Sequence, residues 1–312
     1  MFGSGEKIDY NLRPAKQIER KMLCEAFRRL SVFDPVESYR YVGLGSFYFA
    51  DFTLIHKSLG MTDMISIEAE GSKAQRFRFN RPFGCVSLRF GHSNKILEKL
   101  SWRKRTILWL DYDYRIDESC FSDISLFCNN ARSGSMLIIT VDAQTESEPD
   151  DLFDDLTERV GQERVPLGIT AKSLTGWGMA KVSHRIIINE ISSVIGSRNA
   201  LREKSEVFTF RQLFNFHYKD SAQMLTVGGM IYADNESDKF QACNFGSLGF
   251  VRSASAPYKI ELPRLTFREI RHLQSQLPID PAKLKSKGIK REELRKYAKV
   301  YRWFPSFAEV EM

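Results

Sequence analysis

The segment 39–68 constrains the fold of this chain more than any other stretch. A short apolar strand at 41–42 runs into the turn Gly43–Ser46, where glycine permits backbone angles and close approaches that a side chain would block. Residues 48–59 then carry apolar side chains at mostly helical spacing. A second apolar strand, 64–67, ends on Glu68. This order of strand, glycine turn, helix and strand predicts one βαβ unit of a parallel sheet.

Glu68 makes this unit a candidate nucleoside site. Ligands of an open parallel sheet bind outside the carboxyl ends of the strands, and an acid that ends the second strand can bind ribose hydroxyls. Glu68 follows Gly45 by 23 residues, which fits that position. The alternative is a plain strand-to-helix turn with a solvated Glu68, because Tyr48 stands where the dinucleotide pattern has its third glycine.

The alternation of strands and helices continues along the chain. Apolar strands at 85–90, 106–110 and 135–141 are separated by helical patterns at 96–100 and 120–131. The strand at 106–110 is almost wholly apolar, as expected for a strand that is buried on both faces. Two further strands, 213–218 and 223–233, flank the hairpin-sized connection Lys219–Ser221. The sequence therefore predicts an α/β fold: a doubly wound, mostly parallel sheet with a terminal antiparallel hairpin, plus N- and C-terminal helical additions.

Three segments are expected. Residues 1–38 form an N-terminal helical segment, in which cations such as Lys16 and Arg20 surround the apolar stripe of a helix at 13–30. Residues 39–235 form a Rossmann-like domain with an insertion at about 142–178. Residues 236–312 form a basic, mainly helical region, with helices near 266–277 and 291–301. The aromatic side chains of Phe79, Phe83, Trp102 and Trp109 are expected in the core.

Composition excludes several classes of protein. The chain has no run of eighteen apolar residues and no apolar N-terminal core, so neither a membrane span nor a secretion signal is expected. Its five cysteines form no CxxC pair and its five histidines are scattered, which argues against a metal site and a disulfide framework. A cytoplasmic protein is predicted. A homodimer is compatible with exposed apolar helix faces.

Positive charge is concentrated near the C-terminus. Residues 264–303 contain twelve Lys or Arg and four Asp or Glu, whereas the whole chain has a net charge of +7. Basic surfaces attract nucleic-acid phosphates through counterion release. This segment is therefore either a nucleic-acid contact or a solvated helical surface.

Several stretches together resemble a known family. They are residues 11–16 (NLRPAK), 19–22 (ERKM), 41–46 (YVGLGS), 109–113 (WLDYD) and 301–307 (YRWFPSF). With these stretches the chain resembles class I S-adenosylmethionine-dependent methyltransferases, and more closely bacterial proteins labelled "putative O-methyltransferases". The resemblance covers nearly the whole chain and implies S-adenosylmethionine as cofactor.

The resemblance also implies roles for individual residues. Gly43, Gly45 and Ser46 would lie against the methionine part of the cofactor, and Glu68 would bind the ribose. The remaining implied positions are Gly91, His92 and Ser93 near the adenine, with Asp111 and Asp113 facing the substrate and the methionine end. The sequence departs from the family pattern at Tyr41, where an acid is usual, and at Phe47, where a third glycine is usual.

Three functions remain open at this stage. The first is methyl transfer to a small molecule or protein, in which Asp111 and Asp113 place or deprotonate the acceptor and the N-terminal helix is a lid or dimer surface. The second is a nucleic-acid methyltransferase that uses residues 264–303. In base-modifying enzymes an acid, two prolines and an aromatic ring stand where this chain has Asp111–Tyr114; here the prolines are absent, and Tyr112 and Tyr114 are expected to pack. The third is a non-catalytic sensor or partner protein.

Overall fold

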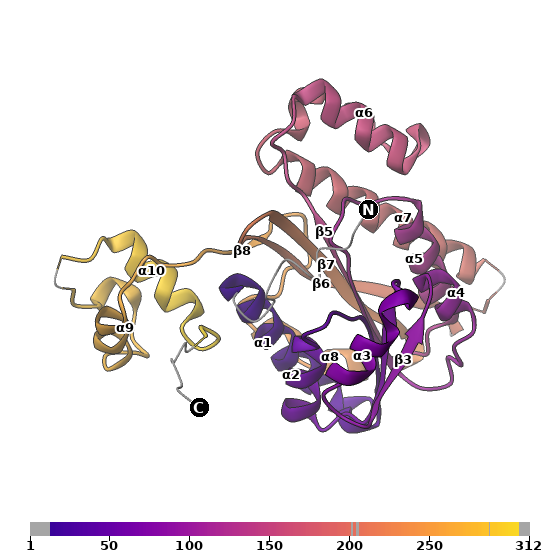
Figure 1. The fold of residues 1–312 in the computed structure, drawn as a ribbon, viewed down its shortest axis with the longest axis horizontal. Coiled ribbons are helices and arrows are strands. Elements are labelled where there is room, and N and C mark those ends of the chain that lie inside the picture. Colours follow the sequence, from indigo (N-terminus) through magenta and orange to yellow (C-terminus); the bar gives the residue numbers. More distant parts are fainter. Residues whose placement is uncertain (1–12, 201, 204–205, 287, 306–312) are drawn as a thin grey trace.

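An eight-stranded mixed sheet forms the centre of the molecule (Figure 1). The structure is a computed structural model, and it describes residues 13–200, 202–203, 206–286 and 288–305. The strand order is β3-β2-β1-β4-β5-β7-β6-β8. The first five of these pair in parallel, β7 is antiparallel to both β5 and β6, and β8 is parallel to β6.

The strands lie close to the predicted positions. Their bounds are β1 Arg40–Leu44, β2 Asp63–Glu68, β3 Val86–Phe90, β4 Thr106–Asp111, β5 Ser135–Asp142, β6 Phe208–Lys219, β7 Gln223–Ala233 and β8 Tyr258–Ile260. β6 begins five residues earlier than the predicted strand, and its register with β7 shifts between Gln212 and Phe214. Such a bulge interrupts the alternation of side chains that marks a strand in sequence. β8, of only three residues, was not predicted.

The helices follow the expected alternation. They are α1 Pro14–Arg28, α2 Ala50–Leu59, α3 Ala74–Asn80, α4 Ser93–Glu98, α5 Glu118–Asn130, α6 Pro149–Val160, α7 Gly178–Asn199, α8 Ser237–Ala242, α9 Phe267–Gln274 and α10 Arg291–Val300. A capping box is present at the start of α9, since Thr266 and Glu269 bond reciprocally. None of the helices in the described ranges combines the length and the apolar character that crossing a membrane requires.

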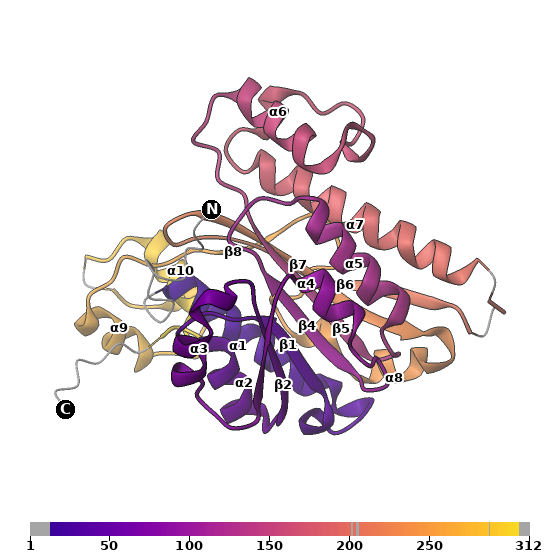
Figure 2. The ribbon, with the colours of Figure 1, turned by 45° about the vertical axis from the view of Figure 1, so that its right-hand side comes forward.

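Helices lie on both faces of the sheet (Figure 2), and each face has its own apolar core. On one face, α1 and α2 pack through residues such as Phe27 and Phe52 against strand residues such as Ile138. On the other face, α4, α5 and α7 pack against residues such as Leu108 and Leu137. Both faces of the central strands are therefore covered, which confirms the doubly wound α/β fold. Trp109 is buried as expected, but Phe79 is 89% exposed on α3 and that expectation was wrong.

Helix α1 is an integral layer of the fold and does not form a lid. Its buried residues include Lys16 and Arg20, which were expected on the exposed face and are only 2% and 3% exposed. The expectation was wrong because Lys16 pairs with Asp111 of β4 and Arg20 lies near Asp51 of α2, so both cations point inward. Asp220, in the hairpin between β6 and β7, accepts hydrogen bonds from the backbone N–H groups of Ala15 and Lys16, at 3.0 and 3.1 Å.

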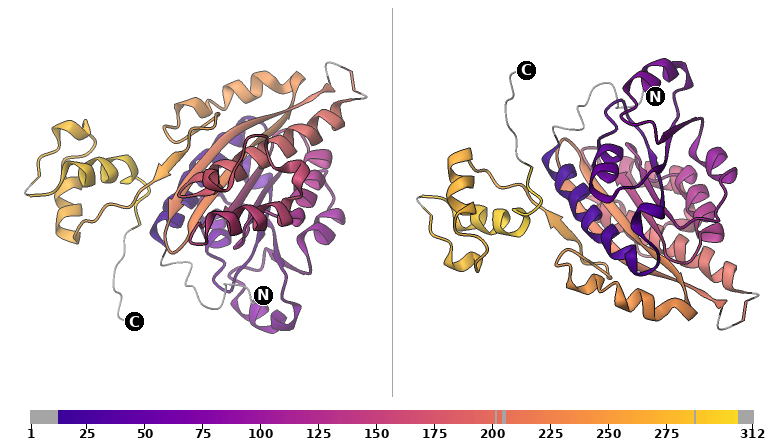
Figure 3. Two further views of the ribbon diagram at one scale, coloured as in Figure 1. Left: turned by 90° about the horizontal axis from the view of Figure 1, so that it is seen from above. Right: turned by 90° about the horizontal axis from the view of Figure 1, so that it is seen from below.

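The C-terminal region contains a small helical module, here residues 264–305. Its own apolar core consists of Leu273, Leu284, Leu294 and Tyr297. Figure 3 shows this module beyond one end of the three-layer body. It is fixed to the body through Trp303, which packs on Phe250 and donates a hydrogen bond to Glu25 at 2.7 Å. The hydroxyl of Tyr258 in β8 also donates to the Lys299 carbonyl, at 3.2 Å.

Replacing Asp220 by alanine should destabilise the protein. The substitution removes the acceptor that satisfies two backbone donors at the start of α1, a loss of about 1–2 kcal/mol. Urea unfolding followed by circular dichroism measures the change. Asp154→Ala on the exposed side of α6 is the control and should change stability by less than about 0.5 kcal/mol. Equal effects of the two substitutions would contradict a capping role for Asp220.

Candidate active site

A cavity of about 270 Å³ lies at the carboxyl ends of β1, β2, β3 and β4. All of the predicted site residues except Gly43 line it: Gly45, Ser46, Glu68, Gly91, His92, Ser93, Asp111 and Asp113. Gly43 lies within β1, just before the lining begins at Leu44. The parallel register explains this convergence, because the strands end at the same edge of the sheet.

Gly45 and Glu68 are in close contact across two neighbouring strands. A Cβ atom on Gly45 would lie 1.9 Å from Glu68 Oε1 and 2.1 Å from Ser66 Oγ. The Ser66 hydroxyl donates a hydrogen bond to the same Glu68 oxygen, at 2.6 Å. Glycine is therefore required at position 45, since any side chain would displace the carboxylate from the wall of the cavity.

The environment of Glu68 favours its protonated form. Its side chain is 2% exposed, and burial raises its pKa to about 8 from 4.5. The Ser66 hydrogen bond opposes this rise, whereas the negative charges of Asp51 and Glu70 add to it. Hydroxyl donors that enter the cavity would stabilise the carboxylate form.

Tyr41 stands where the family pattern has an acid, and an acid from the next helix reaches it. The Tyr41 hydroxyl donates a hydrogen bond to Asp51 in the first turn of α2. A Cβ atom on Gly43 would come within 2.8 Å of that hydroxyl. The glycine turn therefore lies over a tyrosine–carboxylate pair. Burial raises the pKa of Asp51, and the nearby charge of Arg20 opposes that shift.

The loop after β3 is linked to the end of β4 through Asp123 of α5. Its carboxylate accepts hydrogen bonds from the hydroxyls of Ser93 and Tyr112, the latter at 2.6 Å. Burial raises the pKa of Asp123 to about 6. Tyr112 is 2% exposed, so it packs as expected and does not present a stacking surface. In the same loop Gly91 has a φ of +138°, a conformation that favours glycine.

A buried ion network joins α1 to the end of β4. Lys16 Nζ lies 2.7 Å from Asp111 Oδ1, 2.8 Å from Glu19 Oε2 and 3.1 Å from the Tyr218 hydroxyl. It also lies 4.7 Å from the centroid of the Trp109 ring. Glu19 is fully buried, and burial raises its pKa despite the nearby Lys16. A buried cation next to two acids fixes the orientation of Asp111.

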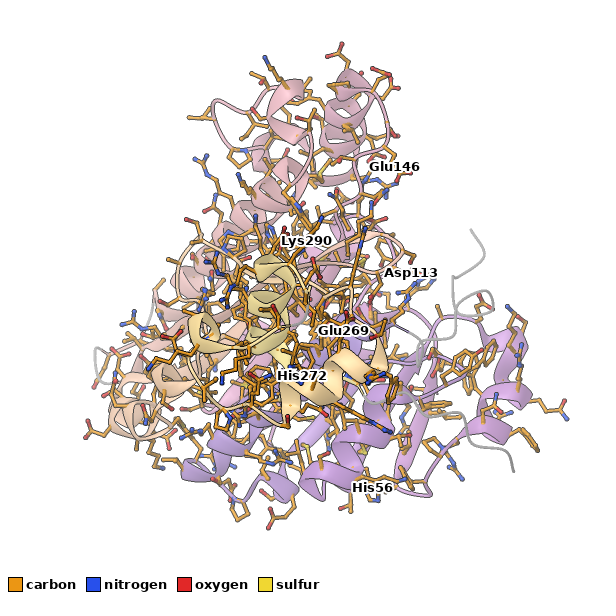
Figure 4. The ribbon with its side chains drawn as sticks, turned by 90° about the vertical axis from the view of Figure 1, so that its left-hand side faces the viewer. His56, Asp113, Glu146, Glu269, His272 and Lys290 are labelled. Carbon is orange, nitrogen blue, oxygen red and sulfur yellow. The ribbon has the colours of Figure 1, made fainter. Side chains whose placement is uncertain are left out.

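A second cavity, of about 120 Å³, adjoins the first. Residues Asp111–Asp113 line both cavities, so this segment separates them. The other wall comes from Asp142 at the end of β5, from Arg13 and Lys16, and from residues of the β6–β7 hairpin. Asp113 is exposed at this rim and is labelled in Figure 4.

Several of these residues were not identified from the sequence. Lys16, Glu19 and Asp123 lie on helices and bond to residues of other elements, and Asp51 lies within the helical pattern 48–59 without having been singled out. A possible signal is the charged triplet Lys16, Glu19 and Arg20, whose spacing places all three on one helix face. Within the described residues, no group of three His, Cys, Asp or Glu side chains could hold a metal ion.

Comparison with known families identifies the chain. The model of the family described as "Putative O-methyltransferase" matches residues 8–312. The chain belongs to this family. The match includes the glycine turn, Glu68, Asp111 and the helix that carries Lys16. A comparison with curated protein sequences finds no match.

Solved structures with a similar chain path have low sequence identity to this chain. A putative O-methyltransferase from Klebsiella pneumoniae is 13% identical, with a TM-score of 0.38 over 74% of this chain and 94% of that one. Trm1 from Pyrococcus horikoshii, in complex with S-adenosyl-L-methionine, is 9% identical, with a TM-score of 0.45 over 73% of this chain and 58% of that one. The fold assignment for this family member therefore rests on its strand order and on the family match.

The raised pKa of Glu68 predicts a dependence of stability on pH. Between pH 4.5 and 8 the folded protein retains a proton on Glu68 that the unfolded chain has released. This residue therefore lowers the free energy of unfolding as pH rises, by up to about 1.4 kcal/mol per pH unit. Urea unfolding of the wild type and of Glu68→Gln at pH 5, 6, 7 and 8 measures the difference. The wild type should lose stability relative to the variant as pH rises, and parallel curves would contradict the assignment.

Proposed function

We propose that this protein transfers a methyl group from S-adenosylmethionine, bound in the first cavity, to an acceptor in the second. The observation that carries the proposal is the position of Asp111–Asp113 in the walls of both cavities. A methyl donor and its acceptor must meet in line, and two adjoining cavities with a shared wall allow that arrangement. Membership of the O-methyltransferase family supports the same reaction class.

The residues of the first cavity fit such a cofactor. The close contact between Gly45 and Glu68 leaves backbone and carboxylate exposed to the cavity without an intervening side chain. Glu68 can accept hydrogen bonds from a pair of ribose hydroxyls, which favour its charged form. Ser93 and its loop, held by Asp123, form the opposite part of the wall. Trm1, one of the similar structures, has S-adenosylmethionine bound.

The bound sulfonium would supply an already activated methyl group, so little further chemistry is required. Asp111 and Asp113 place the acceptor, and one of them takes up its proton. Lys16 holds Asp111 in position through an ion pair at 2.7 Å. Asp113 is more exposed than Asp111, whose carboxylate is held by Lys16, so we assign the proton acceptor to Asp113 and the orienting role to Asp111.

Replacing Gly45 by alanine should abolish cofactor binding. The new Cβ atom would meet the Glu68 carboxylate and push it from the cavity wall. Isothermal titration with S-adenosylhomocysteine measures the effect, and affinity should fall at least about 100-fold. Gly71→Ala is a matched control near the same cavity, because a Cβ atom there meets nothing within 4 Å. Unchanged binding by a folded Gly45→Ala variant would contradict the site.

Replacing Asp111 or Asp113 by asparagine should separate binding from turnover. Asp113→Asn leaves Glu68, the glycine turn and the Lys16–Asp111 ion pair in place, so the affinity of this variant for S-adenosylhomocysteine should change by less than about threefold. The rate of S-adenosylhomocysteine formation with an acceptor panel should fall by about 100-fold or more for Asp113→Asn, as expected for loss of a general base. Asp117→Asn, at the cap of α5, is the control for loss of a nearby charge. Full turnover by both variants would exclude the proposed roles.

A further inference from the structure

The helical module 264–305 contains essentially all of the excess positive charge of the protein. It has twelve Lys or Arg and four Asp or Glu, a net charge of +8, whereas the whole chain has +7. The remaining residues together are therefore close to neutral, at −1. An excess of positive charge that is confined to one small module creates a local electrostatic potential there. A charge that served only to keep the protein in solution would be spread over the whole surface.

The acids of the module are engaged inside it, and most of its cations point outward. Glu269 completes the capping box of α9, and Asp280 caps the short turn at 281–283. Glu292 and Glu293 both pair with Lys296, at 2.6 and 3.2 Å. Exposed cations that form no ion pair within the described residues are Arg268, Arg271, Lys283, Lys285, Lys290 and Arg295. Figure 4 looks onto this side of the molecule, with Lys290 labelled.

An aromatic groove lies beside one of these cations, Arg271. It has a volume of about 510 Å³, and its lining includes Phe267, Arg271 and Phe304. Phe267 is 53% exposed, and the Arg271 guanidinium lies 5.6 Å from the centroid of its ring. Exposed aromatic rings beside cations are the combination that binds single-stranded nucleic acids, because bases stack on the rings while phosphates meet the cations.

The sheet places this module beside the proposed acceptor cavity. β6, β8 and the central parallel strands run in the same direction, so their carboxyl ends lie at one edge. Tyr218 lines the second cavity and pairs in register with Ile260 at the end of β8. The chain therefore leaves β8, four residues before the module begins, one strand spacing, about 4.8 Å, from a residue of that cavity. Along the edge the order is first cavity, second cavity, basic module.

We propose that the methyl acceptor is a nucleic acid, whose single-stranded segment is bound by the module 264–305 and delivered to the second cavity. This inference rests on the proposed function for the transfer step, but not for the binding step. A membrane surface fits less well, since Leu273, Leu294 and Tyr297 of α9 and α10 are buried in the module's own core, which leaves Phe267 as the exposed apolar side chain of these two helices. An acidic peptide would use the cations but would leave the aromatic groove without a planar partner.

The binding step is tested by fluorescence anisotropy with the full chain. The labelled ligands are 20-nucleotide RNA and DNA, each single-stranded and duplex. Affinity for a single strand should fall steeply between 50 and 200 mM salt. The variant R268E/R271E should bind at least about tenfold more weakly than the wild type. The control K172E/R185E makes the same change in net charge on exposed residues of the body and should bind within about twofold of the wild type. Equal loss in both variants would overturn the assignment to the module.

Competition experiments separate the other partners. Polyglutamate or phosphatidylglycerol vesicles that displace the single strand at equal charge concentration would overturn a nucleic-acid assignment. Phe267→Ala should weaken single-strand binding about fivefold or more without affecting the affinity for polyglutamate, and no effect on the single strand would overturn the stacking role.

The methyl-transfer step is tested by following tritium from methyl-labelled S-adenosylmethionine to the bound strand. Parallel assays with RNA and with DNA show which of the two is the acceptor. A strand that binds but is not methylated, with S-adenosylmethionine still bound by calorimetry, would overturn the acceptor inference and leave the proposed function intact. Absence of S-adenosylmethionine binding would instead overturn the proposed function, while binding of the strand would still support the module.

Discussion

The ion network around Lys16 is the interaction on which the site depends. One ammonium group is buried between Asp111, Glu19 and Tyr218, so it joins α1 to strands β4 and β6. Burying charges costs several kcal/mol per ion, and removing one partner of such a group is strongly destabilising. The network therefore persists only if all three elements are in place. Formation of the rim of the sheet and docking of α1 are, in this sense, one event.

Through this dependence the N-terminal helix positions Asp111 at the rim of the sheet. Asp111 is held by a residue 95 positions earlier in the chain, and the start of α1 is held in turn by Asp220 of the β6–β7 hairpin. The same hairpin forms part of the second cavity. Helix, central strand and hairpin thus define the space between the two cavities. The basic module follows the neighbouring strand β8, so the proposed acceptor site lies between the first cavity and the charged surface.

Local patterns predicted much of this arrangement, and the errors have specific causes. The strands β1 to β5 and the glycine turn were identified because apolar runs, glycine positions and the alternation of strands with helices can all be recognised in short stretches of sequence. Lys16 and Arg20 were placed on a solvated face because an isolated helix gives no sign of acids that face it from other elements. Phe79 was assigned to the core by residue type alone, but α3 lies beside the edge strand β3, where its outer side has no covering layer. Asp51 was overlooked because the family pattern has its acid at position 41. Tyr41 stands there in this chain, and its contact with Asp51 is seen only in the structure.

The sequence by itself determined the alternation of strands and helices, the turn Gly43–Ser46, the acid that ends β2 and the segregation of charge to residues 264–303. These features are encoded by spacing and composition over short stretches. Only the tertiary structure decided which carboxylates lie in a common cavity, that Glu68 is buried enough to hold a proton near neutral pH, and that Lys16 neutralises the end of β4. Burial and long-range pairing depend on elements that meet only when the sheet closes, so no local pattern can specify them.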